Sequence, residues 1–229
     1  MEVCGTHTEA IGRFGLRSIL NDNFNLISGP GCPVCVTHSS YIDYVYNLAL
    51  NENIIIATYG DMIRVPGSTP SISLEKAKAL GGDIRIVYSS IDAVSLAIDN
   101  PQSKVLFLGI GFETTAPHTA VAIKEAKYNN IKNFYVLSMH KSVEPVMKSL
   151  LRDKELNIQG FLCPGHVAAI IGEKGFYFLR DFNCPGVITG FKIEDIVVGL
   201  WKLLKMIKER DIGVENAYKS IVSKDGNIV

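Results

Sequence analysis

The spacing of two cysteines gives the first candidate for chemistry. Cys32 and Cys35 form the one C-x-x-C pair of the sequence, inside the segment Gly29-Pro30-Gly31-Cys32-Pro33-Val34-Cys35. In an α/β chain this spacing indicates a redox-active pair or half of a metal site. A structural zinc site needs a second close pair of ligands. Because Cys163 and Cys184 each stand alone, the redox role is favoured, and a pair of inert thiols is the alternative.

Cys4 and His7 are the second candidate. They lie three positions apart across a glycine, so both side chains can reach one ion, and a thiolate with an imidazole suits iron or zinc. The alternative is a buried cysteine followed by a capping histidine, since free cysteines are among the most buried residues. The residues by themselves leave both interpretations open.

Two further polar clusters precede expected helices. Glu113, Thr114 and Thr115 come just before a helix expected from Pro117, where they could bind a small polar ligand or a partner, or move protons; a threonine N-cap explains them equally well. His166 follows Pro164-Gly165 at another expected helix N-terminus. Such a position lowers the pKa of a histidine and favours its neutral, metal-binding form. An ordinary first-turn residue is the alternative there.

The elements that must position these residues alternate between short β-rich runs and helical stretches. Ile54-Ile55-Ile56-Ala57 and Val105-Leu106-Phe107-Leu108 are continuous apolar runs, which are typical of parallel strands buried on both faces. The expected strands are Glu2–Cys4, Asn25–Ser28, Asn53–Tyr59, Ile84–Ser89, Lys104–Ile110, Asn133–Met139, Gly160–Cys163 and Gly186–Thr189. Helices are expected over 8–20, 41–50, 73–80, 91–98, 117–129, 142–151 and 194–210. This alternation predicts an α/β fold with right-handed crossovers.

We expect two α/β lobes, each with a mostly parallel sheet flanked by helices, around a central cleft. The polar, proline-containing segment 99–103 divides the strands equally, so the predicted lobes are 1–98 and 103–229. The candidate residues nearly all follow expected strands. Because ligands of open parallel sheets bind beyond the carboxyl ends of the strands, these residues are expected to gather on rims that face the cleft.

Composition excludes several functional classes. The 229-residue chain is 47% hydrophobic with a formal net charge of zero, which argues against binding to duplex nucleic acid. No apolar run reaches the roughly 18 residues of a membrane span. The start shows no basic region followed by an apolar one, as a secretory signal would. Five cysteines in a chain of this size do not suggest a disulfide framework, so we expect a cytoplasmic protein.

Taken together, four motifs point to a family. They are Met1–Thr8 (MEVCGTHT), Ser28–Val36 (SGPGCPVCV), Gly111–Pro117 (GFETTAP) and Pro164–Val167 (PGHV). In this order and spacing the chain resembles the HypD family of hydrogenase formation proteins, from Met1 to about Asn227. The resemblance implies two similar α/β domains around a cleft, plus a third region.

The resemblance also implies a function. HypD-like proteins work with the chaperone HypC as the scaffold on which the iron of nickel–iron hydrogenases receives its cyanide and carbonyl ligands, with HypE delivering the cyanide. Cys4 would be the thiolate that holds the Fe(CN)2CO unit, with His7 as its neighbour. Cys32 and Cys35 would be the redox-active pair. The motifs place Glu113, Thr114 and Thr115 among the catalytic residues, and Thr6, Gly165 and His166 among those that contact the iron unit.

The chain departs from the family pattern in three places. Relatives continue into a cysteine-rich segment that holds a 4Fe–4S cluster, whose ligands are absent here, and they carry a helical segment before the first motif. Relatives usually read Gly-Phe-Glu-Pro where this chain has Gly190-Phe191-Lys192-Ile193. We therefore expect a fragment or a truncated paralogue. Two alternatives to a working scaffold remain: a module that only binds partners, and a stand-alone thiol oxidoreductase.

Overall fold

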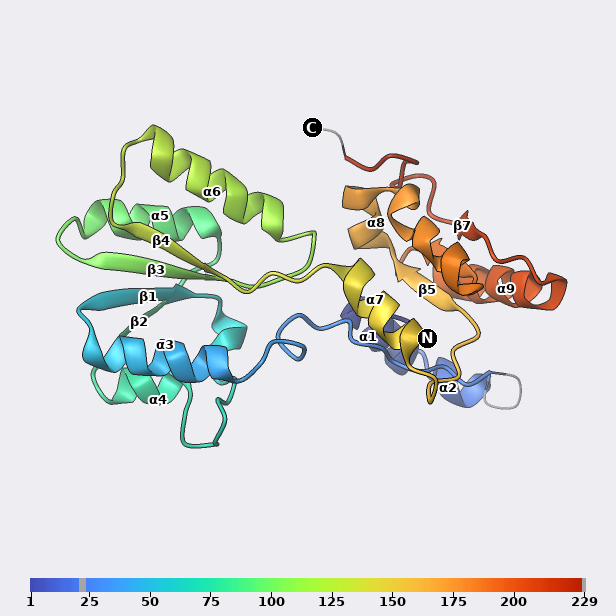
Figure 1. Ribbon diagram of the computed structural model, residues 1–229, viewed down its shortest axis with the longest axis horizontal. Coiled ribbons are helices and arrows are strands. Elements are labelled where there is room, and N and C mark those ends of the chain that lie inside the picture. Colours follow the sequence, from blue (N-terminus) through green and yellow to red (C-terminus); the bar gives the residue numbers. More distant parts are fainter. Residues whose placement is uncertain (21–23, 228–229) are drawn as a thin grey trace. The chain divides into compact units, whose positions relative to one another are not determined.

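The computed structural model describes residues 1–20 and 24–227. The chain forms two compact units, unit 1 being Met1–Cys32 with Ser142–Val229 and unit 2 being Pro33–Lys141. Each contains a parallel sheet flanked by helices (Figure 1), which confirms the predicted α/β class. The last two residues of the predicted second lobe, 228–229, lie outside the described residues.

Unit 2 is built on a four-stranded parallel sheet with the order β2-β1-β3-β4. Its strands are β1 (Ile54–Thr58), β2 (Asp83–Ile86), β3 (Lys104–Gly109) and β4 (Phe134–Ser138). Ile56 pairs with Ile84 on one side and with Leu106 on the other. The chain leaves β1 toward one edge of the sheet and later continues from β3 toward the other. The carboxyl ends of β1 and β3 therefore form a topological switch point, where open α/β sheets bind ligands.

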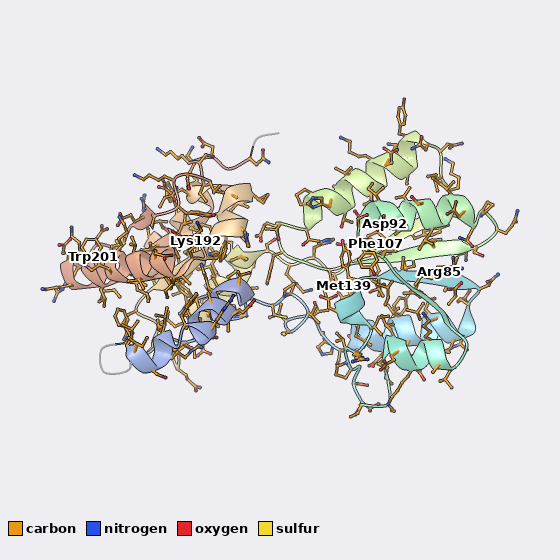
Figure 2. All side chains as sticks on the ribbon, turned by 180° about the vertical axis from the view of Figure 1, so that it is seen from behind. Arg85, Asp92, Phe107, Met139, Lys192 and Trp201 are labelled. Carbon is orange, nitrogen blue, oxygen red and sulfur yellow. The ribbon has the colours of Figure 1, made fainter. Side chains whose placement is uncertain are left out.

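Helices cover both faces of this sheet (Figure 1). In Figure 1, α3 and α4 lie on one side and α5 and α6 on the other; their bounds, with the short η1, are α3 (Ser40–Asn51), η1 (Gly60–Met62), α4 (Leu74–Ala79), α5 (Ser90–Asp99) and α6 (Ala116–Tyr128). Ile54 and Ile56 pack with the α3 side chain Ile42, whereas Ile55 packs with the α5 side. Phe107 (Figure 2) also packs on the α5 side and is fully buried. This alternation explains why the strands read as unbroken apolar runs.

Unit 1 contains a three-stranded parallel sheet with the order β5-β6-β7. Its strands are β5 (Phe161–Pro164), β6 (Gly186–Thr189) and β7 (Val214–Asn216). The first residues of the chain lie beside β5, where the Leu162 N–H donates to the Met1 carbonyl at 2.9 Å. Glu2 forms isolated parallel bridges with Leu162 and Ser28. In place of the strands predicted at Glu2–Cys4 and Asn25–Ser28, the structure has only these bridges among its described residues. The segment Glu2–Cys4 cannot extend as a strand because helix α1 begins at Gly5.

The helices of unit 1 lie on both faces of its sheet. They are α1 (Gly5–Arg13), α2 (Leu16–Ile19), α7 (Val143–Arg152), α8 (Gly165–Ile171), η2 (Glu173–Phe182) and α9 (Ile193–Glu209). Leu162 and Val187 pack in one core with α1 and α9. Gly186, the neighbour of Val187 in β6, faces the opposite side of the sheet, where Leu179 of η2 packs against it. The single helix predicted over 8–20 is divided at Gly15, which takes a φ of +61°.

The observed division of the chain differs from the boundary predicted at 99–103. That segment lies inside unit 2, because β1 and β3, on either side of it in sequence, are paired neighbours. The Asn133 amide also lies within 2.8–3.0 Å of the carbonyls of Ala97, Asn100 and Ser103, which fixes the connection. Residues 1–32 belong with the C-terminal part through their contacts with β5. None of the described helices is long and apolar enough to cross a membrane.

Candidate functional site

The motifs of unit 1 gather at the carboxyl edge of its sheet. Each follows a parallel segment: Gly29–Cys32 follows Ser28, Cys4–His7 follows Glu2, Gly165-His166 follows β5, Gly190-Phe191 follows β6, and Tyr218 follows β7. Parallel pairing brings all of these ends to one edge. The structure thus brings together Cys4, Thr6, His7, Cys32, Gly165 and His166 of the predicted site residues.

Cys4 occupies the N-cap position of α1 and is half-buried. Its backbone N–H donates to Glu2 Oε2 at 3.0 Å, and Thr8 Oγ1 donates to Glu2 Oε1 at 2.5 Å. Glu2 is 2% exposed, so a buried carboxylate fixes the backbone that carries the thiol. The sequence analysis did not identify Glu2 as a residue that supports the site. A charged residue inside a segment expected to be a buried strand was the signal that could have indicated this role.

Gly31 brings the C-x-x-C segment against Cys4. The Gly5 N–H donates to the Gly31 carbonyl at 3.3 Å, and a Cβ on Gly31 would lie 2.5 Å from Cys4 N and 2.6 Å from Cys4 Cα. Only glycine permits this approach of two backbones. Because Cys32 is the next residue, the contact brings the start of the C-x-x-C pair to the Cys4 backbone.

The C-x-x-C segment continues into unit 2, which begins at Pro33. Thr37 Oγ1 donates to the Pro33 carbonyl at 2.8 Å and the Thr37 N–H to the Val34 carbonyl at 3.1 Å, so the segment closes as a turn. Cys32 is half-buried and Cys35 is exposed. The second thiol of the pair is therefore open to solutes or to another protein.

His7 is fully buried in the first turn of α1. Its Nε2 lies 2.9 Å from the Gly190 carbonyl, and a carbonyl only accepts, so Nε2 carries the proton. Nδ1 has no hydrogen-bond partner among the described residues. Burial is the main cause that lowers the pKa of His7, partly opposed by the bond to Gly190. The imidazole is therefore neutral, with its protonated Nε2 held by the Gly190 carbonyl and its lone pair on the buried Nδ1.

Metal binding by these residues alone is limited. Within residues 1–20 and 24–227, no group of three or more His, Cys, Asp or Glu side chains is placed to hold a metal ion. An iron bound at Cys4 would need ligands that do not come from such a cluster. A 4Fe–4S cluster is held by four cysteines, and the described residues offer no such set.

His166 lies in the first turn of α8 and is exposed. Its ring stacks on Phe191 with centroids 3.9 Å apart and planes 29° apart. Partial desolvation of its ring lowers the pKa of His166, which is the predicted direction. Gly165 is required before it, since a Cβ there would lie 2.6 Å from the Thr189 carbonyl oxygen. Thr6 is exposed in the first turn of α1.

The remaining predicted residues lie in unit 2. Thr115 is at the N-cap position of α6, but within the described part of the chain its side chain makes no capping hydrogen bond. It lines a pocket of about 590 Å³ at the carboxyl ends of β1 and β3. The other walls come from the C-x-x-C segment, from the segments after β1, β2 and β3, and from the N-terminal halves of α5 and α6. They are Pro33, Val34, Tyr59, Asp61, Tyr88, Ser89, Ser90, Ile91, Ile110, Gly111, His118 and Val121. Glu113 and Thr114 are half-buried in the turn before α6. The C-x-x-C and Gly-Phe-Glu-Thr-Thr motifs therefore meet in one pocket at the switch point.

Comparison with known proteins identifies the family. A model named HypD and described as "Hydrogenase formation hypA family" matches residues 1–229. The chain belongs to the HypD family. Among curated HypD-family relatives, the hydrogenase maturation factor HypD of Escherichia coli (strain K12) is 44% identical over 230 residues. The hydrogenase maturation factor HypD2 of Bradyrhizobium diazoefficiens is 45% identical over 235 residues.

A putative hydrogenase expression/formation protein of Methanocaldococcus jannaschii is 40% identical over 230 residues. All of this chain aligns with each of the three relatives, but it covers 61%, 62% and 63% of their respective lengths. The chain thus spans about three fifths of the HypD-family proteins that it matches.

Proposed function

We propose that this HypD-family chain acts in hydrogenase maturation as the part of a scaffold that holds iron while the Fe(CN)2CO unit is assembled. In this proposal Cys4 is the thiolate ligand of the iron, and Cys32 and Cys35 are the dithiol that supplies electrons. A HypC-like chaperone and a HypE-like cyanide donor are the expected partners. The iron unit is cargo that is later passed on, not a resident cofactor.

The contact between Gly31 and Cys4 carries this proposal. It brings Gly31, the residue directly before the first thiol of the pair, against the residue that would bind the iron, and a glycine without room for a side chain maintains the approach. A stand-alone thiol oxidoreductase would need only the C-x-x-C turn. The buried Glu2 carboxylate that holds the Cys4 backbone would have no role in it.

The dithiol chemistry balances without another reductant in a single turnover. For a donor that carries cyanide on sulfur, one thiolate of the pair attacks that sulfur, the S–CN bond breaks and cyanide leaves. The second thiolate then attacks the mixed disulfide, which forms the Cys32–Cys35 disulfide and releases the donor thiolate. Two thiolates lose two electrons in total, and the donor sulfur and cyanide receive them. Re-reduction of the disulfide would need an external dithiol before the next turnover.

The N-terminus of α1 suits the cyanide ligands of such a unit. The first N–H groups of a helix have no partner within the helix, and they favour negative charge. Cys4 is at the N-cap, and the exposed Thr6 hydroxyl lies in the first turn, so both could face the iron unit. Neutral His166 can donate one hydrogen bond to a cyanide nitrogen. His7, held by the Gly190 carbonyl, is assigned to fixing α1 rather than to binding the iron.

The pocket of unit 2 is proposed to bind the group of the donor that carries the cyanide. Pro33 and Val34 of the C-x-x-C segment and Thr115 line it together, so a group seated there would lie next to the dithiol turn. Glu113, Thr114 and Thr115 are proposed to bind this group or to move protons to and from the thiols.

The test is iron retention by the chain copurified with a HypC-like partner. We expect Cys4→Ala to lose the iron, whereas Cys163→Ala, a substitution at a fully buried thiol, keeps it. Equal loss in both variants would refute the role of Cys4. Copurification of partners without iron in the unsubstituted chain would favour the partner-binding module. Catalytic reduction of a disulfide substrate without partners would favour the oxidoreductase.

A further inference from the structure

Phe191 connects the histidines of two separate motifs. Its ring centroid lies 3.9 Å from that of His166 and 4.7 Å from that of His7, with planes 29° and 34° apart. Tyr218 completes the group with an edge contact to Phe191 at 6.4 Å. The proximity of His166 is also among the causes that lower the pKa of His7. One phenyl ring therefore touches α1, α8 and the turn after β7.

The backbone around Phe191 is fixed by close approaches. The preceding residue, Gly190, accepts the hydrogen bond from His7 Nε2 at 2.9 Å, and a Cβ on Gly190 would collide with the Asp195 carboxylate. A Cβ on Gly165, which precedes His166, would lie 2.8 Å from Tyr218 Cδ1. Lys192, labelled in Figure 2, follows Phe191 as the N-cap of α9. The phenyl ring thus projects from a turn that has little freedom to move.

The surroundings of Phe191 are unlike those of a core phenylalanine. It is half-buried, and it is absent from the apolar clusters found among the described residues. Its aromatic neighbours among the described residues are two imidazoles and a phenol. Aromatic pairs at these distances have preferred geometries and stabilise them beyond the area that they bury. The ring is therefore placed to determine how the two imidazoles are oriented.

We propose that Phe191 is a positioning residue for the iron site, acting through His166 and His7. By stacking on His166 it fixes the imidazole of an exposed residue in one orientation, and by contacting His7 it helps to hold α1, whose N-cap is Cys4. The proposal rests on the function proposed above, in which Cys4 binds the iron and His166 contacts its ligands. Residues that orient ligand-binding groups in this way typically change metal affinity by about 10–100-fold when they are substituted.

The test compares Phe191→Leu, which removes the ring, with Phe191→Tyr, which keeps it. Phe24→Leu is the matched control, because Phe24 is a half-buried phenylalanine of the same unit that packs on an apolar cluster. In the iron-free 229-residue chain, NMR of the histidine side chains is expected to show shifted His166 and His7 ring resonances in Phe191→Leu. Phe191→Tyr should leave these resonances close to their original positions, and Phe24→Leu should not move them.

With the HypC-like partner present, iron retention in Phe191→Leu should fall about tenfold, and the infrared bands of bound cyanide and carbonyl should shift. Phe191→Tyr should restore both. Unchanged ring resonances in Phe191→Leu, or iron retention equal to that of Phe24→Leu, would overturn the proposal. Because the NMR measurement needs no iron, failure of the positioning role is distinguishable from failure of the iron site, which Cys4→Ala tests separately.

Discussion

Replacing Gly31 by alanine tests the contact on which the proposed site depends. The new Cβ would lie 2.5 Å from Cys4 N, 2.6 Å from its Cα and 2.7 Å from its carbonyl carbon. These are backbone atoms, so no side-chain rotation can relieve the overlap, and the two segments must separate by about 1 Å to reach ordinary contact. The Gly5–Gly31 hydrogen bond, already 3.3 Å long, would then be lost.

The expected magnitude follows from these two effects. Overpacking of this kind destabilises by about 1–3 kcal/mol, and loss of a hydrogen bond adds about 0.5–1.5 kcal/mol. The lower entropy of an unfolded chain with alanine offsets about 0.4–1 kcal/mol. Gly31→Ala should therefore lower the free energy of unfolding of unit 1 by about 0.5–4 kcal/mol. It should also reduce iron retention, because it separates the Cys4 backbone from Gly31, the residue directly before Cys32.

Urea denaturation followed by circular dichroism measures the stability change, and Gly12→Ala is the control. Gly12 lies in α1, and a Cβ there would meet nothing within 4 Å, so its replacement should stabilise the helix by about 0.5–1 kcal/mol and leave iron retention unchanged. If Gly31→Ala proves as stable as Gly12→Ala and retains as much iron, the contact between Gly31 and Cys4 does not hold the site together.

Three further predictions test the fold and the burial of its polar groups. Asn133→Ala should destabilise unit 2 by about 1–3 kcal/mol. Asn133→Asp should destabilise it by more, because a carboxylate would replace an amide donor that faces three carbonyls. The urea midpoints of both variants measure this. In the reduced native chain at pH 8, iodoacetamide should label the exposed Cys35 but spare the buried Cys163 and Cys184. Burial raises the pKa of Cys163 and that of Cys184, the latter to about 11. Mass spectrometry that shows fast labelling of Cys163 in the native chain would contradict this prediction. Burial lowers the pKa of His7 below its ordinary value of 6.5, so the stability that neutral His7 contributes is present above about pH 6.5 and is lost as the pH falls. The free energy of unfolding of His7→Gln should therefore depend less on pH between 7.5 and 5.5 than that of the unsubstituted chain.

The strands of unit 2 could be predicted because burial on both faces leaves a continuous apolar run. Ile54–Thr58 and Lys104–Gly109 fall within the runs that predicted them, and the α/β class followed from their alternation with helices. β7, at Val214–Asn216, was missed because three residues are too few to show a period. The helix predicted over 8–20 gave no sign that it would begin at Gly5 and bend at Gly15.

The division of the chain could not be predicted, because it depends on pairing between distant segments. Met1 and Glu2 pair with β5, some 160 residues away, through single bridges and hydrogen bonds to Gly160 and Leu162. Such contacts leave no local pattern. A polar segment with a proline resembles a linker in sequence, whereas residues 99–103 connect neighbouring elements of one sheet.

The candidate site was partly predictable for a related reason. Residues that carry chemistry, such as Cys4, Cys32 and His166, are recognisable by type and spacing. The residues that hold them are not, because Glu2 and Phe191 acquire their roles from partners that are remote in sequence: Glu2 from its burial beside β5, and Phe191 from contacts with His7 and His166.

Parallel topology explains why such remote residues meet. In unit 1 the segments that end at Glu2, Ser28, β5, β6 and β7 all run in the same direction, so the residue after each end lies on one edge without any special folding step. Glycines at 31, 165 and 190 then let neighbouring backbone and side-chain atoms approach more closely than a Cβ would allow. The space available to the backbone therefore constrains this edge before the chemistry of its side chains does. Alanine at Gly31, Gly165 or Gly190 should then impair iron retention as severely as loss of His166.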